Sequence, residues 1–389
     1  MVTKHSLNNW QTKKLGEVCD VLDNKRRPVT QRDRISGEYP YYGATGILDY
    51  VDDYIFDEKL ILIGEDGAKW GAGENTAFIA DGKYWVNNHA HVIRPHRHII
   101  LDNWIVYFLY VTDLSKYITG LTVQKLNQGK LREIEIPLPP LPAQQRIVAI
   151  LDEAFAAIAT AKENAETNLQ NARELFESYL QSVFANPGDG WKEKTLDQVS
   201  ITFGRGKSKH RPRNEKTLYG GKYPFIQTGD IRNSNHYITE YSQTYSEIGL
   251  AQSKLWPKGT ICITIAANIA ETGILGFDAC FPDSVIGLVV NPKIAEMNFV
   301  EYMLQSFKAR LQEKGKGSAQ DNLNMGTFEN ELFPIPTLPE QQRIVAKLDA
   351  LSDETKKLEA IYRQKLADLD ELKKSVLQKA FTGQLTMEN

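Results

Sequence analysis

Apolar residues recur at alternating spacings of four and three in two long stretches that, beyond their opening residues, contain neither glycine nor proline. This spacing is typical of helices that pair along one apolar seam. It predicts one helix over residues 142–185 and another from 339 toward the end of the chain, each on the order of 60 Å long for about 40 residues. The seam of the first stretch comprises Ile147, Leu151, Ala154, Ile158, Ala161, Ala165, Ala172, Leu175 and Tyr179. The seam of the second comprises Ile344, Leu348, Leu351, Leu358, Tyr362, Leu369, Leu372 and Val376.

The two seams differ in side-chain size. The first is rich in alanine and the second in leucine and tyrosine, so small side chains can face large ones. Polar residues interrupt the pattern at Asn168, Thr355 and Lys365. We expect the helices to form an antiparallel coiled-coil pair within one molecule. The alternative is two long surface helices on separate domains.

The helical stretches are copies of one sequence. Leu141 to Asp152 returns as Leu338 to Asp349, with ten of twelve residues identical and a shift of 197 residues. The similarity extends upstream with shifts of 181 to 184, so the segment after Trp10 matches the one after Trp191. The chain is therefore a duplication. We predict domains over residues 1–141 and 186–338, a helix over 142–185, and a helix with a tail over 339–389.

Short runs of β-branched and aromatic residues, separated by Gly-, Asp- and Asn-rich turns, fill the segments before each long helix. This pattern is typical of short strands, and a shorter helical stretch follows them in each copy. We predict two α/β domains joined by the long antiparallel helix pair, with a circular pseudo-twofold repeat. In that arrangement the C-terminal residues return to the first domain. The pattern does not specify the strand order.

The composition is that of an ordinary globular protein, with 42% hydrophobic and 24% charged residues and a net charge of −3. No apolar run reaches 18 residues, so we expect no membrane span. The three cysteines are scattered, which fits a reducing cytoplasm and no zinc site. The slightly acidic charge argues mildly against nucleic-acid binding, but local clusters matter more than the sum.

Basic residues cluster at corresponding places in the two copies. Such clusters on loops suit phosphate binding, although a solvated charged loop is the ordinary alternative. The first cluster contains Lys25, Arg26, Arg27, Arg32 and Arg34. The second contains Arg205, Lys207, Lys209, Arg211, Arg213 and Lys216.

Several loops carry side chains that can read base edges, which requires paired donors and acceptors. Turn capping is the alternative for each of them. His89 and His91 share a strand face, as metal ligands can, but no cysteine completes a ligand set, so we expect no metal. The further candidates for DNA contact are Lys69, Asn87, Asn88, His89, His91, Gln227, Thr228, Arg232, Gln320 and Asn322.

No catalytic set assembles in the sequence. There is no Gly-x-x-x-x-Gly-Lys-Ser/Thr phosphate loop and no Asn/Asp-Pro-Pro-Tyr of the kind that amino-methyltransferases use. We therefore expect a protein without catalytic activity of its own.

The chain resembles the specificity subunits of type I restriction–modification enzymes over its full length. The marks are the paired Leu-Pro-x-Gln-Gln-Arg-Ile-Val blocks, the Trp-x-x-x-x-Leu-x-x-Val openings, and the closing segment from Lys379 to Leu385. Tyr39 to Gly46, and Val86 to Val92 with its two histidines, are also similar. The family's tandem short repeats after the first helix are absent, since Ala185 to Gly190 reads as a simple turn.

The resemblance implies a DNA-recognition subunit in the cytoplasm. Each domain would read one half of a split, asymmetric DNA site. The helices would set the spacing and dock two adenine-N6 methyltransferase subunits, and through them restriction subunits. S-adenosylmethionine, ATP and Mg²⁺ are then expected only on those partners. The candidates for docking or for the coiled coil are Gln144, Gln145, Arg146, Ile147 and Leu151 with their repeats Gln341, Gln342, Arg343, Ile344 and Leu348.

Two other functions remain open at this point. One is a self-contained enzyme, such as a nuclease with fused recognition domains, against which the absent motifs speak. The other is an adaptor whose two domains bind proteins, and this reading predicts no effect of neutralising the basic clusters.

Overall fold

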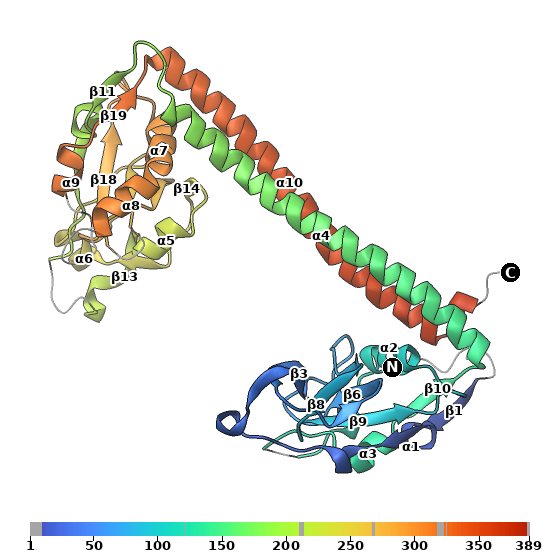
Figure 1. Ribbon diagram of the computed structural model, residues 1–389. Coiled ribbons are helices and arrows are strands. Elements are labelled where there is room, and N and C mark those ends of the chain that lie inside the picture. Colours follow the sequence, from blue (N-terminus) through green and yellow to red (C-terminus); the bar gives the residue numbers. More distant parts are fainter. Residues whose placement is uncertain are drawn as a thin grey trace. The chain divides into compact units, whose positions relative to one another are not determined.

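A computed structural model describes residues 10–386 apart from 121, 210–213, 267–268, 317–322 and 324 (Figure 1). The chain divides into two compact units. Unit 1 combines Met1–Glu166 with Arg363–Asn389, and unit 2 is Thr167–Tyr362. Each unit therefore holds one globular domain together with part of each long helix.

The long helices are α4 (Leu141–Ala185) and α10 (Leu338–Phe381). Each begins one residue before the predicted start. The shorter helices of unit 1 are α1 (Leu15–Val18), α2 (Asp102–Val111) and α3 (Gln128–Arg132). Those of unit 2 are α5 (Thr228–Arg232), α6 (Glu247–Ala251), α7 (Met297–Ser306), α8 (Lys308–Lys316) and α9 (Met325–Glu329).

The strands are short, as their sequences predict. Those of unit 1 are β1 (Gln11–Lys14), β2 (Cys19–Val21), β3 (Ser36–Gly43), β4 (Gly46–Val51), β5 (Phe56–Asp57), β6 (Leu60–Gly64), β7 (Ala77–Ala80), β8 (Lys83–Val86), β9 (Ala90–Pro95) and β10 (Glu135–Leu138). Those of unit 2 are β11 (Lys192–Lys194), β12 (Ser200–Arg205), β13 (Tyr219–Phe225), β14 (Tyr237–Ile238), β15 (Gln243–Tyr245), β16 (Ile261–Thr264), β17 (Thr272–Leu275), β18 (Val285–Val290) and β19 (Phe333–Ile335).

Each unit contains its own central sheet, and the two sheets have corresponding strand orders. The order is β2-β9-β6-β7 in unit 1 and β12-β18-β16-β17-β14 in unit 2. Every residue of β6 and of β16 is buried, so these central strands are continuous apolar runs rather than alternating ones. Helix α2 packs on β6 and β7, and α7 packs on β17. The duplication seen in the sequence is therefore a duplication of one topology.

The remaining strands differ between the units. Unit 1 adds a four-stranded sheet of order β4-β3-β8-β5, whereas β13 in unit 2 pairs with β15 alone. The loops that connect these strands carry most of the predicted DNA contacts. The central sheet is thus the constant part of each unit, and the additional strands with their loops are the divergent part.

Helices α4 and α10 run antiparallel within both units. Lys162 pairs with Asp370 in unit 1, and the Arg173 Nε lies 3.2 Å from the Glu359 carboxylate in unit 2. As α4 advances by eleven residues, its partner recedes by eleven. The antiparallel pair is confirmed.

The predicted seam is correct at all but three of its apolar positions. Leu175, Leu358 and Leu372 are exposed by 51%, 37% and 48%. The residues that directly follow them, Phe176, Glu359 and Lys373, are half-buried instead. A strict seven-residue repeat drifts around an α-helix, and a step of four plus four residues restores the contact. Such a step displaces the seam by one residue at these three positions and leaves the positions between them in place.

The C-terminal residues of α10 complete the core of unit 1. Leu377 and Ala380 are fully buried, and the Phe381 ring centroid lies 4.6 Å from that of Trp104. Unit 2 repeats this contact between Phe184 and Phe299, with centroids 5.4 Å apart. The expected return of the C-terminal residues to the first domain is confirmed. None of the helices in the described ranges combines the length and apolarity that a membrane crossing requires.

Candidate nucleic-acid interface

The basic cluster of unit 1 lies on the loop that follows β2. Lys25, Arg27 and Arg32 have exposed side chains. Arg32 pairs with the exposed neighbour Asp33 at 3.4 Å, a contact that solvent screens strongly. These three cations can therefore reach a phosphate backbone, and they remain predicted contacts.

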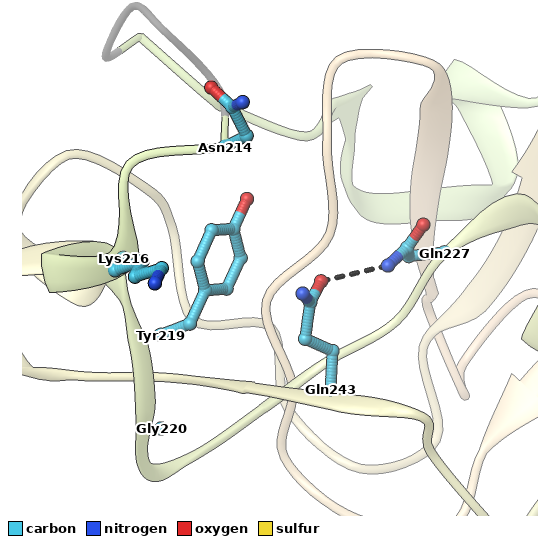
Figure 2. A pocket seen from close by; sticks show the side chains of 6 residues that line it. All are labelled: Asn214, Lys216, Tyr219, Gly220, Gln227 and Gln243. Carbon is cyan, nitrogen blue, oxygen red and sulfur yellow. Dashed lines mark hydrogen bonds between the residues drawn. The ribbon is translucent and has the colours of Figure 1, made fainter.

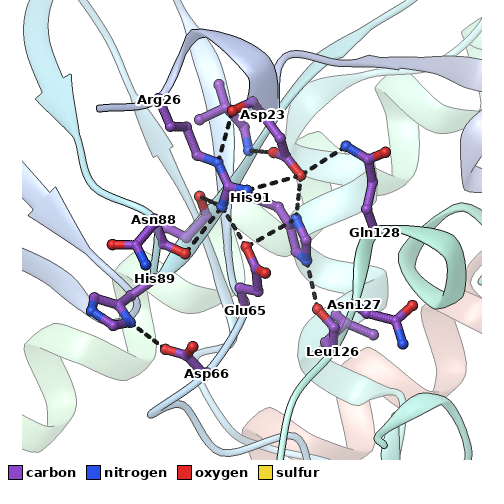
Figure 3. Close-up of polar contacts among 12 residues, drawn as sticks. Asp23, Arg26, Glu65, Asp66, Asn88, His89, His91, Leu126, Asn127 and Gln128 are labelled. Carbon is purple, nitrogen blue, oxygen red and sulfur yellow. Dashed lines mark hydrogen bonds and ion pairs between the residues drawn. The ribbon is translucent and has the colours of Figure 1, made fainter. Parts of the chain in front are cut away.

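Arg26 points the other way, into unit 1 (Figure 3). Its Nη1 donates to the Glu65 carboxylate at 2.5 Å and to the Ala90 carbonyl at 2.8 Å. Its Nη2 lies 3.4 Å from the Asp23 carboxylate, and only 12% of the side chain is exposed. We therefore correct the prediction for Arg26. It is a structural cation that ties the basic loop to the sheet.

His91 is fully buried beside this arginine. Its Nδ1 lies 2.6 Å from Asp23 Oδ2, and its Nε2 lies 2.6 Å from the Leu126 carbonyl oxygen. Burial alone would raise the pKa of Asp23, but the hydrogen bond and charge of His91, helped by Val92 N–H and Arg26, lower it below its ordinary value. A side chain so enclosed is not free to touch DNA, so the prediction for His91 is also corrected.

Asp23, Glu65 and His91 bring ligand atoms within 4.8 Å of one another, as a metal site would. No other group of this kind is found among the described residues. The guanidinium of Arg26 contacts both carboxylates, and Lys125 Nζ lies 2.8 Å from Glu65. Side-chain cations therefore already balance the two negative charges, and we assign the network a structural role.

The loop after β8 is divided between buried and exposed residues. Asn87 is buried, and its Oδ1 accepts from the His89 backbone N–H at 2.8 Å. It caps a turn, which corrects its predicted role. Asn88 and His89 are exposed, and the His89 ring contacts the Asp66 carboxylate. Lys69 is exposed on the neighbouring loop. Asn88, His89 and Lys69 remain predicted contacts.

Unit 2 presents its basic cluster at the end of β12. Arg205, Lys207 and Lys209 are exposed, and Arg205 Nε donates to the Asp283 carbonyl at 2.8 Å. This bond holds the Nε of the guanidinium group in place, while the side chain as a whole stays exposed to solvent. The predicted contacts Arg211, Arg213, Gln320 and Asn322 lie outside the described residues.

A pocket of about 610 Å³ lies beside this cluster (Figure 2). Gln227 is exposed at its rim, and Thr228 and Arg232 follow on α5. Sequence reasoning missed Gln243, which no motif marks. It reaches Gln227 because β13 and β15 pair with Phe225 opposite Gln243. The pocket is lined by Asn214, Lys216, Tyr219, Gly220, Gln227 and Gln243.

A second buried polar network supports the segment after α5. His236 adopts a left-handed backbone with φ 73°, and its Nδ1 lies 2.6 Å from the fully buried Glu301 carboxylate. Its ring stacks on Tyr302 at 4.6 Å, and its Nε2 lies 3.1 Å from Asn298 Oδ1. Burial opposes charge on the imidazole, but the pair with Glu301 raises the pKa of His236 above its ordinary value. No sequence motif marks this pair.

Gln144 occupies the joint between α4 and the domain of unit 1. It is fully buried. Its Oε1 accepts from Leu101 N–H at 2.9 Å, and its Nε2 donates to the carbonyls of Ile99 at 2.9 Å and Pro139 at 2.8 Å. This one amide joins the start of α2, the preceding loop and the approach to α4.

Gln341 repeats the same joint in unit 2. Its Oε1 accepts from Glu296 N–H at 2.7 Å, and its Nε2 donates to Ile294 and Pro336 carbonyls at 3.2 and 2.9 Å. The prediction that Gln144 and Gln341 dock a partner is therefore corrected, because both amides are used internally. The apolar candidates pack in the domain cores, which agrees with their predicted place in the helix seam and excludes docking: Ile147, Leu151, Ile344 and Leu348.

The exposed face of the repeated block is left for contacts outside the unit. Gln145 and Arg146 are exposed in unit 1, as are Gln342 and Arg343 in unit 2. Arg343 approaches Glu340 at 3.4 Å on the surface. These four residues keep their predicted docking role.

Two α/β domains of one topology, each carried by part of an antiparallel helix pair, define a class of duplicated protein in which constant helices support divergent domains. Residues 8–169 and 188–366 each match the family model described as the type I restriction modification DNA specificity domain. The chain belongs to this family and is a specificity subunit by its relatives.

One relative is a putative type I restriction enzyme specificity subunit of Haemophilus influenzae, S.HindORF215P. It is 32% identical over 351 residues, which cover 87% of this chain and 86% of that protein. A putative MjaX specificity subunit of Methanocaldococcus jannaschii is 22% identical over 98% of this chain and 94% of its own.

Solved structures share the fold. The crystal structure of the HsdS subunit from Thermoanaerobacter tengcongensis matches with a TM-score of 0.62 and 19% identity, covering 97% of both chains. A chain from a study of complex assembly and conformational transition of the type I restriction–modification system matches with a TM-score of 0.75 and 20% identity. That alignment covers 97% of this chain and 99% of the other.

Proposed function

We propose that this chain is the non-catalytic DNA-recognition subunit of a type I restriction–modification complex. Each α/β domain reads one half of an asymmetric, split DNA site. The helix pair sets the distance between the halves and docks two adenine-N6 methyltransferase subunits, which in turn recruit restriction subunits. S-adenosylmethionine, ATP and Mg²⁺ bind the partners, and the complex works in the cytoplasm, where its DNA target lies.

The observation that carries this proposal is identity at exposed positions. Gln145 and Arg146 recur as Gln342 and Arg343, although none of the four is buried. Packing explains why Gln144 and Gln341 are identical, since each makes three internal hydrogen bonds. It does not explain identical exposed neighbours. Two identical surfaces suit two copies of one partner.

The divergent loops support the DNA-reading part of the proposal. Exposed cations lie at corresponding places in both units, at Lys25 and Arg27 in unit 1 and at Lys207 and Lys209 in unit 2. Phosphate contacts of this kind hold a protein on DNA, while other side chains read bases. Because the two domains differ in sequence around these cations, they are expected to read different half-sites.

The test is co-expression with a type I methyltransferase subunit in a host that lacks its own adenine methylation. Sequencing of the methylome should return one split, asymmetric motif that is methylated on adenine. A purified complex that methylates no such motif would refute the proposal. Cleavage or methyl transfer by the purified chain alone would instead favour a self-contained enzyme.

The protein-binding adaptor predicts a different result. Replacement of Lys25, Arg27, Lys207 and Lys209 by alanine should weaken DNA binding by the complex and reduce its salt dependence. The adaptor predicts no change in either quantity. Replacement of Arg146 and Arg343 is the matched control, since it should reduce assembly with the methyltransferase and leave the phosphate contacts in place.

A further inference from the structure

The pocket of unit 2 holds a pair of amide side chains that are bonded to each other. Gln227 Nε2 donates to Gln243 Oε1 at 2.8 Å (Figure 2). Gln227 is exposed and Gln243 is half-buried, so the pair is open to a ligand and is also held in place by the protein. An exposed amide pair of this kind has fewer rotamers to lose on binding than two free glutamines.

The pair leaves the oxygen of the donating amide and the NH₂ group of the accepting amide unused. An amide has one oxygen acceptor and one NH₂ group with two donor hydrogens. Once one amide donates to the other, the donating residue still offers its oxygen and the accepting residue still offers its NH₂. This holds whichever of the two glutamines donates. A neighbouring donor and acceptor match the N7 acceptor and N6 donor that adenine shows in the major groove.

The surroundings suit DNA better than an apolar ligand. The lining residues include one cation, Lys216, and no carboxylate. The nearby Asp230 carboxylate accepts from the Gln227 backbone N–H at 2.8 Å and from Ser242 at 3.3 Å. Tyr219 forms a firm wall, because its ring packs 5.3 Å from that of the fully buried Tyr245.

Unit 1 lacks this pair. The segment from Gly37 to Pro40 matches Gly221 to Pro224 at a shift of 184 residues, which places Gly43 opposite Gln227. A Cβ atom at Gly43 would lie 2.4 Å from Leu48 Cδ1, so a larger side chain there would have to displace Leu48. The amide pair is therefore a property of one domain alone.

We infer that the Gln227–Gln243 pair reads an adenine in the half-site that unit 2 recognises, with Gln243 donating to adenine N7 and Gln227 accepting from N6. Lys216 lies on the same rim and neutralises a phosphate. This inference rests on the proposed function, since it assigns a base to one domain of a DNA-recognition subunit.

The experiment compares methylomes of hosts that express the methyltransferase subunit with wild-type, Gln227→Ala or Gln243→Ala chains. The wild-type motif should contain an A·T pair in one half that becomes degenerate in both variants. Preference at that position should fall about 5- to 150-fold, the discrimination of one good bidentate contact. The other half-site should be unchanged, which also shows that the variant folds and assembles.

Gln198→Ala is the matched control, because Gln198 is an exposed glutamine of the same unit outside the pocket. It should leave the motif unchanged. An unchanged motif in Gln227→Ala and Gln243→Ala overturns the inference, as does an equal loss of methylation at all sequences. The proposed function itself fails in a different way, when the wild-type chain gives no split motif.

Discussion

Replacement of Gln144 by alanine tests whether one buried amide fixes the joint between α4 and the domain of unit 1. The side chain is fully buried and makes three hydrogen bonds of 2.8–2.9 Å to backbone groups. The substitution removes all three hydrogen bonds at once. The N–H of Leu101 and the carbonyls of Ile99 and Pro139 would then lie in a cavity.

Each buried backbone group without a partner costs about 1–3 kcal/mol. A water molecule that enters the cavity restores part of this loss. The expected decrease in the free energy of unfolding of unit 1 is therefore about 3–5 kcal/mol. This is a large share of the roughly 5–15 kcal/mol that stabilise a typical domain.

The assay is chemical denaturation of the full chain, followed by tryptophan fluorescence and by calorimetry to separate the two units. Gln145→Ala is the control on the same helix turn, because Gln145 is exposed. Its effect on unfolding should stay within about 0.5 kcal/mol. A Gln144→Ala protein as stable as Gln145→Ala would refute the argument that the amide is a structural joint.

Four further predictions concern charge and packing. Arg26→Ala should lower the free energy of unfolding by about 3–5 kcal/mol, because it leaves two enclosed carboxylates without their guanidinium. Arg27→Ala should leave the free energy of unfolding unchanged and reduce the slope of log K for DNA binding by the complex against log salt concentration by about 1. Equal losses of stability in the Arg26 and Arg27 variants would contradict the view that Arg26 is internal and Arg27 is free. The pKa of His236 is raised above 6.5 by Glu301, so its stabilising effect is complete below that pH and is lost as the pH rises through the folded-state pKa. Thermal stability of unit 2 should therefore fall on the alkaline side of pH 6.5, and His236→Gln should flatten this trend; the opposite slope would refute it. Phe381→Ala should destabilise unit 1 by about 3–5 kcal/mol through loss of its packing on the core, and a loss below about 1 kcal/mol in denaturant titration would show that the C-terminal contact is dispensable.

The long helices show where periodicity succeeds and where it fails. Their bounds follow from the uninterrupted apolar pattern and agree with the structure to one residue at each start. Three later seam positions do not agree, because Leu175, Leu358 and Leu372 are exposed. Thr355 is 4% exposed, and its hydroxyl donates to the Leu351 carbonyl at 3.0 Å, so a polar residue lies inside the seam without penalty. The step that follows it depends on the partner helix, which a single helix pattern does not contain.

The basic cluster of unit 1 shows the same division. Arg26 and Arg27 are adjacent and chemically identical in the sequence. One faces Glu65 and Ala90, and the other faces solvent. The difference comes from Glu65, which directly follows β6, and from Ala90 in β9, which lie 39 and 64 residues away along the chain. Local composition predicts a cation-rich loop but does not predict which cation is free.

By itself, the sequence determined the duplication, the two long helices, the mixed α/β domains and the family. The first three depend on local periodicity or on internal identity, and the family depends on the resemblance of short motifs; all of these are written in consecutive residues. The tertiary structure alone decided that Gln144 and Gln341 are joints, that His91 and Arg26 are internal, and that Gln243 lies beside Gln227. These roles depend on hydrogen bonds between distant segments, because burial and strand pairing determine which polar groups are already satisfied and which remain available to DNA.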